Sequence, residues 1–413
     1  MQIVGYVSLL AASLFPAVLF AQSAPSLPVP VGQSATSAEP VWQMQDSGTT
    51  AGLRGIDSVD SKVAWASGTG GTVLRTIDGG AHWTRCATPD ADKDGATLDF
   101  RGVQAWDAQT AIVMASGPGD KSRLYRTNDG CKTWKLLFIN PDGDGFWDAF
   151  RLVQVPTGKA EPATRRQGVI VGDPVDGVFA EFTSQDGDQW TKADGGQAGL
   201  PSARSGETIF AASNSSLLFV GAGQVLFVTG GAAGSRSRLL SEDVKHDPHV
   251  SWKYVGGDIP LAIGPTAGAF SVESSYSYAP KNLPELLSSP PKVGPRVYYF
   301  PTEATCIAVG GDYKKPPKSK GTAAFSVDGG LHWTASITPP HGYRSAVQWS
   351  SSLYAWITVG TNGSDVSRDD GRTWQPLDNG NWNALSLPFV VGPQGRIARL
   401  NPAAILLSSP QPH

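Results

Sequence analysis

A short phrase recurs five times along the chain, and its spacing constrains the fold more than any other feature. Its copies are TIDGGAHW (76–83), TNDGCKTW (127–134), SQDGDQW (184–190), SVDGGLHW (326–333) and SRDDGRTW (367–374). The Asp can accept hydrogen bonds from backbone N–H groups of its own turn, and Gly tolerates the positive φ that such a turn requires. The closing Trp offers a large apolar face to a core. We therefore interpret each copy as a structural hairpin tip followed by a strand, with these defining residues: Asp78, Trp83, Asp129, Trp134, Asp186, Trp190, Asp328, Trp333, Asp369 and Trp374.

The residues before each copy predict three more strands. LRGIDSVDSKVAWASGTGGTVLR (53–75) contains an alternating run, a turn, a short apolar run, a Gly-rich turn and another short run. Such runs between turn formers are typical of short strands. Four short strands in a unit of about 40 to 50 residues are typical of a propeller blade.

The tryptophans that begin the fourth strands allow the blades to be counted. Six are expected, including one after a stretched phrase that begins at Ser241: Trp83, Trp134, Trp190, Trp252, Trp333 and Trp374. A seventh set of three strands, at 381–401, has no fourth strand, and VWQMQ at 41–45 supplies it with Trp42. Ring closure removes the open sheet edges that promote aggregation. The sequence predicts an all-β, seven-bladed propeller of four-stranded blades, closed by the N-terminal strand in the C-terminal blade.

The repeated phrase resembles the Asp-box, which is best known from sialidases. The whole unit resembles the photosystem II stability and assembly factor family, which are seven-bladed propellers exported across a membrane. The resemblance is nearest to the non-photosynthetic bacterial branch and covers 41–402, on the segments GDPVDG (172–177), RSGETIFAAS (204–213), GGDYKKP (310–316) and VGPQGRIARL (391–400). A long Pro/Ser-rich insertion at 276–296 departs from the family pattern. The resemblance implies a binding or assembly module.

The ends of the chain have their own composition. Residues 1–21 are apolar and uncharged, which is typical of a secretory signal peptide, with an uncleaved N-terminal anchor as the alternative. Residues 22–40 are rich in Pro, Ser and Ala and indicate a linker, and 403–413 form a C-terminal tail. We expect one propeller domain over 41–402, located in the periplasm or secreted, with no membrane span after signal cleavage.

Charge and cysteine content limit the partners. The formal net charge is −3 for 413 residues, so the chain lacks the basic footprint of a nucleic-acid-binding protein. We expect a monomer that binds a protein segment or a small anionic ligand. Cys86, Cys131 and Cys306 allow at most one disulfide. We interpret them as buried small apolar residues, with a Cys86–Cys131 bridge as the alternative.

Arginine recurs at the start of the first strand in five blades. In a propeller the first strands line the central channel, so these side chains are expected to converge at one mouth: Arg54, Arg101, Arg151, Arg204 and Arg344. A ring of guanidinium groups suits capture of a carboxylate or phosphate. The alternative is that each Arg pairs locally and packs its stem. Loops on the same side are expected to add Asp173, Asp176, Asp312 and Tyr313.

An acidic loop offers a possible cation site. Asp90, Asp92 and Asp94 alternate before Gly95, which is the opening of a calcium-binding loop. The Glu that completes such a loop is absent, and Arg101 stands in its place. Calcium bound by the three aspartates is therefore the single cofactor considered.

The sialidase resemblance suggests an alternative function. A sialidase-like glycoside hydrolase would use Glu207 and Tyr343 as its catalytic pair, with Asp173 as the further carboxylate. The (F/Y)RIP start that is typical of sialidases is missing, and FRGV and FRLV are the nearest spellings. We therefore favour a non-enzymatic binding module with an Arg-lined channel mouth.

Overall fold

The structure is a computed structural model, and it describes residues 40–156, 164–194, 199–221, 224–243, 251–275 and 304–407. All of them belong to one compact unit, Glu39–His413. The expected signal peptide, the linker up to residue 39 and the 276–296 insertion lie outside the described residues.

The first three blades are regular four-stranded antiparallel sheets. Blade 1 contains β2 (Leu53–Ser58), β3 (Ala64–Gly68), β4 (Thr72–Thr76) and β5 (Thr84–Arg85). Blade 2 contains β6 (Phe100–Ala105), β7 (Ala111–Ala115), β8 (Arg123–Thr127) and β9 (Lys135–Ile139), with the short 3₁₀ turns η1 (Gly95–Thr97) and η2 (Gly119–Lys121) nearby. Blade 3 contains β10 (Trp147–Pro156), β11 (Thr164–Val175), β12 (Val178–Ser184) and β13 (Thr191–Lys192).

Blades 4 and 5 carry additional short strands. Blade 4 contains β15 (Leu217–Gly221), β16 (Gln224–Val228), β18 (Ser235–Asp243) and β19 (Ser251–Val255), and β20 (Asp258–Ile259) pairs with β18. Blade 5 contains β21 (Ala267–Ser274), β22 (Cys306–Asp312), β23 (Ala323–Ser326) and β24 (Thr334–Ala335). Its sheet is extended by β17 (Gly230–Gly231) and β14 (Glu207–Thr208).

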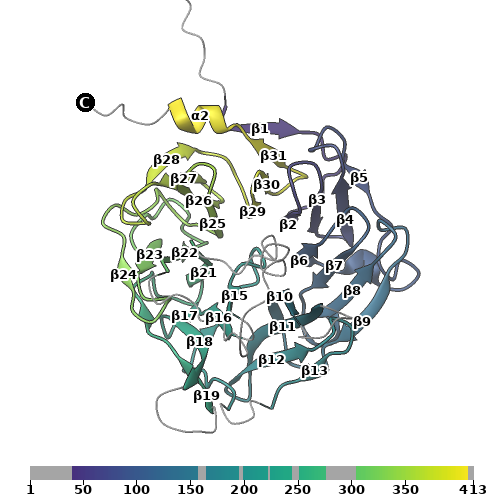
Figure 1. The fold of residues 1–413 in the computed structure, drawn as a ribbon, viewed down its shortest axis with the longest axis horizontal. Coiled ribbons are helices and arrows are strands. Elements are labelled where there is room, and N and C mark those ends of the chain that lie inside the picture. Colours follow the sequence, from purple (N-terminus) through teal and green to yellow (C-terminus); the bar gives the residue numbers. More distant parts are fainter. Residues whose placement is uncertain are drawn as a thin grey trace, which may run out of the picture. The chain divides into compact units, whose positions relative to one another are not determined.

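Blades 6 and 7 complete the ring. Blade 6 contains β25 (Ala346–Ser350), β26 (Ala355–Gly360), β27 (Gly363–Ser367) and β28 (Gln375–Asp378). Blade 7 contains β29 (Ala384–Ser386), β30 (Phe389–Val391), β31 (Ile397–Leu400) and β1 (Trp42–Gln45). Figure 1 shows the first strand of each blade nearest the centre, and the short helix α2 (Pro402–Leu407) beside β31 at the rim. No helix of the described residues is long and apolar enough to cross a membrane.

The N-terminal strand closes the ring, which confirms the predicted fold. β1 pairs antiparallel with β31, and Trp42 lies opposite Leu400. The Trp42 indole donates a hydrogen bond to the Ser364 hydroxyl in blade 6 at 3.0 Å and packs against Trp382. Blade 7 is thus completed by a strand from the other end of the chain.

A glycine near the end of the second strand sets the register of the first strand in most blades. In five blades a Cβ at this glycine would overlap a backbone carbonyl oxygen near the start of the first strand, at Gly68, Gly172, Gly310, Gly360 and Gly392. The two backbones therefore touch there. Leu53 lies opposite Gly68, Trp147 opposite Gly172 and Ala269 opposite Gly310, so the first strands share one register.

A belt of polar side chains joins neighbouring blades around the channel. Asp57 accepts a hydrogen bond from Ala105 N at 2.7 Å, and Gln104 accepts one from Leu152 N at 2.9 Å. The same contact recurs from Leu387 N to Gln348 at 2.7 Å and from Ser58 N to Ser386 at 2.9 Å. The four acceptor residues occupy equivalent positions in the first strands of their blades. Each donor lies one residue further along the chain in the next blade. The belt therefore connects blade 1 to 2, 2 to 3, 6 to 7 and 7 to 1.

The repeated phrase forms a hydrogen-bonded turn between the third and fourth strands. In the first copy, Asp78 accepts hydrogen bonds from His82 N at 3.0 Å and from the Thr76 hydroxyl at 2.8 Å. The Thr76 hydroxyl oxygen in turn accepts from Gly80 N at 2.9 Å. The backbone hydrogen bond from His82, with its side chain, lowers the pKa of Asp78 to about 2. These contacts lie within the turn, which is what a structural role requires.

The cysteines correct one expectation. Cys86 and Cys131 form a disulfide, with their Cα atoms 5.3 Å apart, and only Cys306 is a free buried thiol. Cys131 replaces the second Gly of its phrase and adopts a positive φ of 67°. This conformation directs its side chain from the turn of blade 2 to the end of blade 1. The bridge thus links adjacent blades that the repeat pattern alone does not connect.

The first prediction concerns closure. Removing residues 22–47 deletes β1, so blade 7 loses its outer strand and Trp42 loses its place against Trp382. We expect a sharp fall in melting temperature, measured by circular dichroism. Removing only 22–39 is the matched control and leaves β1 intact. Equal melting curves for both deletions would contradict closure by this strand.

The second prediction concerns the turn network. Asp369 accepts hydrogen bonds from Thr373 N at 2.9 Å, from the Thr373 hydroxyl at 2.6 Å and from the Ser367 hydroxyl at 2.8 Å. Asp369→Ala should lower the free energy of unfolding by about 1–2 kcal/mol. Denaturant titration measures this, and Asp369→Asn, which keeps one acceptor, should lose less. Equal losses in the two variants would show that the acceptor does not matter.

The third prediction is a pH dependence. The folded pKa of Asp78 is about 2, below its usual value of 3.8, so its ionised form stabilises the fold above about pH 4. That contribution is lost as the pH falls from about 4 to about 2. The difference in unfolding free energy between the natural chain and Asp78→Asn should therefore shrink over this range. A difference that stays constant from pH 6 to pH 2 would contradict the assignment.

Candidate functional site

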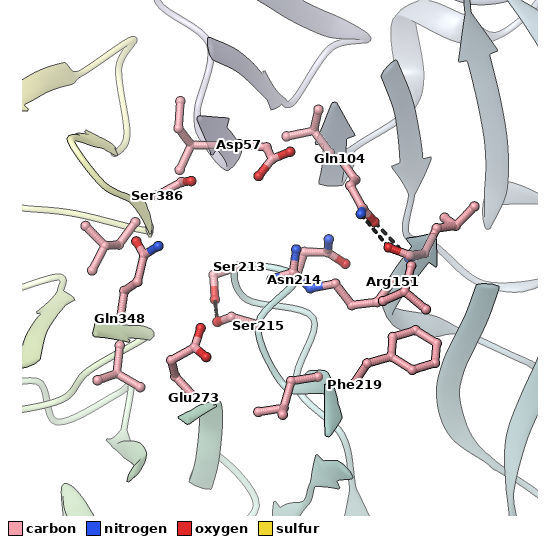
Figure 2. Close-up of a pocket in the computed structure, with 17 residues that line it drawn as sticks. Asp57, Gln104, Arg151, Ser213, Asn214, Ser215, Phe219, Glu273, Gln348 and Ser386 are labelled. Carbon is pink, nitrogen blue, oxygen red and sulfur yellow. Dashed lines mark hydrogen bonds between the residues drawn. The ribbon is translucent and has the colours of Figure 1, made fainter. Parts of the chain in front are cut away.

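In the part of the chain that the structure describes, two cavities lie along the channel, one toward each end of the first strands. We call the first the aromatic cavity; its volume is about 380 Å³ and its lining is Arg54, Arg101, Phe210, Ala211, Ala212, Phe270, Tyr313, Tyr343, Ser345, Thr361 and Asn383. We call the second the polar cavity; its volume is about 220 Å³ and it takes residues from the first strand of all seven blades. Figure 2 shows its labelled side chains, which include Asp57, Gln104, Arg151, Glu273, Gln348 and Ser386, arranged around Ser213, Asn214 and Ser215.

A crossing segment, residues 209–216, separates the two cavities. It joins β14 to β15 and gives Phe210, Ala211 and Ala212 to the aromatic cavity and Ser213, Asn214 and Ser215 to the polar cavity. Four blades hold it: Arg101 donates to Ala211 O at 3.1 Å, Phe150 N to Asn214 at 2.8 Å, Ser215 to the Ser271 hydroxyl at 2.8 Å and Ser213 to Ser345 O at 2.7 Å. The segment therefore spans the channel from side to side.

Two carboxyl groups of blade 3, the buried Asp148 and the partly buried Asp173, also contact the crossing segment. Asp173 accepts a hydrogen bond from Ile209 N at 3.1 Å and one from the Thr208 hydroxyl. Burial raises the pKa of Asp173, and burial together with the charge of Asp173 raises the pKa of Asp148 well above its usual value. Asp173, expected to bind ligand, thus fastens the entry of the segment.

The aromatic cavity combines two guanidinium groups with an aromatic wall. Arg54 and Arg101 share the carboxylate of Asp99, at 3.2 and 2.9 Å, so one positive charge is in excess. Burial lowers the pKa of Arg54. Phe210 and Phe270 stack with ring centroids 4.0 Å apart, and Tyr343 meets Phe270 edge-on at 4.8 Å. Such a site suits a carboxylate attached to an apolar group.

The five predicted arginines do not converge at one mouth. Arg54 and Arg101 line the aromatic cavity, whereas Arg151 lines the polar cavity. Arg204 pairs with Asp258 at 2.8 Å and is half exposed, and Arg344 is fully buried. The expectation of a five-membered ring is corrected, and the alternative of local pairing describes Arg204 and Arg344.

Strand register explains where Arg151 and Arg344 lie. In blade 6 it is Ser345 that lines the aromatic cavity. Arg344 precedes it by one residue and occupies the position that the fully buried Leu53 and Trp147 hold in their blades. Because successive side chains of a strand point to opposite faces, a shift of one residue turns Arg344 away from the channel. Arg151 lies four residues after Trp147, just as Asp57 lies four residues after Leu53, so Arg151 is equivalent to Asp57 and not to Arg54.

Arg344 forms a buried ion pair within blade 6. Its Nε donates to Asp365 Oδ2 at 2.6 Å, and its Nη1 donates to Asn362 Oδ1 at 2.9 Å and to Tyr343 O at 2.6 Å. Both side chains of the pair are inaccessible to solvent. Burial lowers the pKa of Arg344. The side chain is a structural element of the blade.

Of the remaining predicted ligand-binding residues, one lines a cavity and two do not. Tyr313 is partly exposed and lines the aromatic cavity. Asp312 accepts hydrogen bonds from the Thr266 hydroxyl at 2.7 Å and from Lys314 N at 3.0 Å, so it shapes its own loop. Asp176 is exposed in the β11–β12 turn, where its φ is 53°.

The carboxylates of the predicted calcium loop contact basic side chains. Asp94 accepts from Arg123 at 2.8 Å and from Lys121, and these two cations lower its pKa to about 2. Asp90 accepts from the Tyr125 hydroxyl at 2.8 Å, and Asp92 is exposed. Within the described ranges no group of three His, Cys, Asp or Glu side chains is arranged to hold a metal. Calcium binding stays a prediction.

Glu207 and Tyr343, the catalytic pair of the hydrolase alternative, do not line one cavity. Glu207 has an inaccessible side chain that binds Arg236 and accepts from the Thr229 hydroxyl at 2.6 Å. Burial alone would raise the pKa of Glu207, but the hydrogen bonds from Arg236, Arg204 N and Thr229 hold it below its usual value. Tyr343 lines the aromatic cavity, to which Glu207 does not contribute, and burial raises its pKa.

Comparison with known proteins extends to the fold alone. No protein-family model and no curated protein matches the chain. Among solved structures, YCF48 bound to D1 peptide aligns at 15% identity and a TM-score of 0.50, over 87% of this chain and 96% of that one. YCF48 from Cyanidioschyzon merolae aligns at 14% and 0.53, over 88% and 99%. The WD40 propeller domain of Doa1 aligns at 9% and 0.51, over 88% and 98%.

These comparisons define the class of protein. The chain is an all-β seven-bladed propeller, and YCF48, a photosystem II assembly factor, is among the propellers that it resembles in structure. The expected resemblance to the assembly factors is therefore confirmed for the fold.

Sequence reasoning missed the aromatic wall and most of the polar cavity. Phe210 lies in the irregular crossing segment, and Phe270 lies in β21, whose first residues include no Arg. The repeated FRGV sequence therefore does not mark either residue. The glycine near the end of the second strand was a usable signal in five blades. It places Arg54 and Phe270 at one register, and Arg101 shares that register in blade 2, where Ala115 stands in place of the glycine.

The fourth prediction separates packing from binding. Arg344→Ala leaves Asp365 buried without its counter-charge, which should cost about 3–5 kcal/mol of unfolding free energy. Arg204→Ala removes an exposed ion pair and should cost at most about 1 kcal/mol. Denaturant unfolding of both variants measures the contrast. A small loss for Arg344→Ala would restore the possibility that this side chain serves a ligand.

Proposed function

We propose that the chain is an exported, non-enzymatic binding module that captures an anionic protein segment in the aromatic cavity. The observation that carries the proposal is the arrangement of Arg54 and Arg101, which share one carboxylate and face the cavity together. Their excess charge lies next to stacked aromatic rings, so a peptide carboxylate beside an apolar side chain is complementary to both.

Two further observations support the proposal. A solved propeller of similar fold, YCF48, is bound to a D1 peptide, and this supports a peptide as the kind of ligand. The Cys86–Cys131 disulfide is typical of proteins that function in an oxidising compartment and supports the periplasm or the exterior as the location.

The test uses peptides with and without a terminal charge. The full chain is applied to an array of random hexapeptides with free C-terminal carboxylates, and to the same array with amidated C-termini. We expect binding to favour carboxylates and to weaken with added NaCl, because the contact is between charges. Binding that is equal on both arrays and insensitive to salt would contradict the proposal.

The matching variants form the fifth prediction. Arg101→Ala removes a charge-assisted contact, so the affinity for a selected peptide should fall about 10- to 100-fold in fluorescence anisotropy. Arg204→Ala is the control, since its side chain lies outside the cavity. Both variants must first show the melting curve of the natural chain. Equal affinities for the two variants would remove the aromatic cavity as the binding site.

A further inference from the structure

The polar cavity contains a guanidinium group without a protein counter-charge in contact. The Arg151 side chain lines the cavity and makes no hydrogen bond or ion pair with any residue that the structure describes. Beside it, Asn214 is buried; its Oδ1 accepts from Phe150 N at 2.8 Å, but its Nδ2 has no partner. Figure 2 shows the guanidinium reaching toward Asn214. Because a buried donor without an acceptor costs free energy, this pair is suited to a carboxylate.

An acidic group lines the same cavity on blade 5. Glu273 projects from β21 into the cavity, and in the described residues its carboxylate accepts a hydrogen bond from Ser274 N at 2.9 Å. Burial raises the pKa of Glu273, and the hydrogen bond from Ser274 N and the charge of Arg151 across the cavity offset this only in part. An ammonium group placed there would supply the missing charge.

The other polar side chains of the cavity have structural partners. Asp57, Gln104, Gln348 and Ser386 form the belt between blades, so their acceptors are occupied by backbone N–H groups. The belt fixes the walls of the cavity. Arg151, Asn214 and Glu273 remain as the groups that a ligand would satisfy.

We propose that the polar cavity binds a small α-amino acid as a zwitterion, with its carboxylate at Arg151 and Asn214 and its ammonium group at Glu273. Ligand pockets for drug-sized molecules begin at about 300 Å³, so a cavity of about 220 Å³ fits a smaller ligand. The carboxylate of Asp57 is held by the belt, and the zwitterion brings one charge of each sign to the remaining two charged groups, Arg151 and Glu273. The site lies across the crossing segment from the aromatic cavity and does not depend on the function proposed for that cavity.

Six compounds test the charge pattern on the full chain by isothermal titration calorimetry. Glycine, L-alanine and L-serine carry both charges, whereas acetate, ethylamine and N-acetyl-L-alaninamide carry one or none. We expect at least one of the three amino acids to bind ten times more tightly than each of the other compounds. The proposal is overturned if none of the amino acids binds, or if acetate or ethylamine binds as tightly as they do.

Variants then locate the site. Arg151→Gln and Glu273→Gln should each weaken amino-acid binding at least tenfold, and Arg204→Gln, at the exposed Asp258 pair, should leave it unchanged. Binding that survives both cavity substitutions would place the ligand elsewhere and overturn the proposal. If either variant fails to fold, the comparison of probes on the natural chain still decides. Peptide binding is measured separately, so either site can fail without the other.

Discussion

The contact between two backbones at a glycine governs the layout of the channel. Near the end of the second strand, at Gly68, Gly172, Gly310, Gly360 and Gly392, a side chain would overlap a backbone carbonyl near the start of the first strand. The contact fixes the register of the strand that lines the channel. Because side chains alternate along a strand, register decides which residue faces the axis and which packs between blades. Arg54 faces a cavity and Arg344 is buried for this single reason.

Most of the fold could be predicted from the sequence because its signals are local. The Asp and Gly of each phrase specify a turn, and the Trp marks the strand that follows, so the blades can be counted and the displaced strand at Trp42 recognised. The positions of the arginines could not be predicted in this way. FRLV at 150–153 repeats the spelling of FRGV at 100–103, yet Trp147 occupies the register of Phe100. The similar segments FRGV and FRLV therefore differ in register by three residues (Phe150 against Trp147), which only their pairing with the second strand reveals.

The remainder of the candidate site depends on contacts between distant parts of the chain. The residues of the aromatic cavity come from separate blades and from the crossing segment, whose course is set by partners in four blades. No local pattern specifies such partners. The disulfide is a similar case, since Cys131 replaces a glycine that the turn would otherwise use and its pairing depends on the adjacent blade. Local sequence patterns thus predict the blades, whereas the crossing segment, the aromatic cavity and the disulfide depend on contacts between distant residues.

The crossing segment turns one channel into two chemically different sites. Its aromatic side contributes Phe210 next to Arg54 and Arg101, and its polar side contributes Asn214 next to Arg151. Because hydrogen bonds from four blades hold the segment and the belt holds the walls, both sites have fixed donors and acceptors before any ligand arrives. Such preorganisation reduces the entropy that binding must overcome. The selectivity that we propose for each cavity follows from its lining: an excess positive charge beside aromatic rings in one cavity, and the opposite charges of Arg151 and Glu273 in the other.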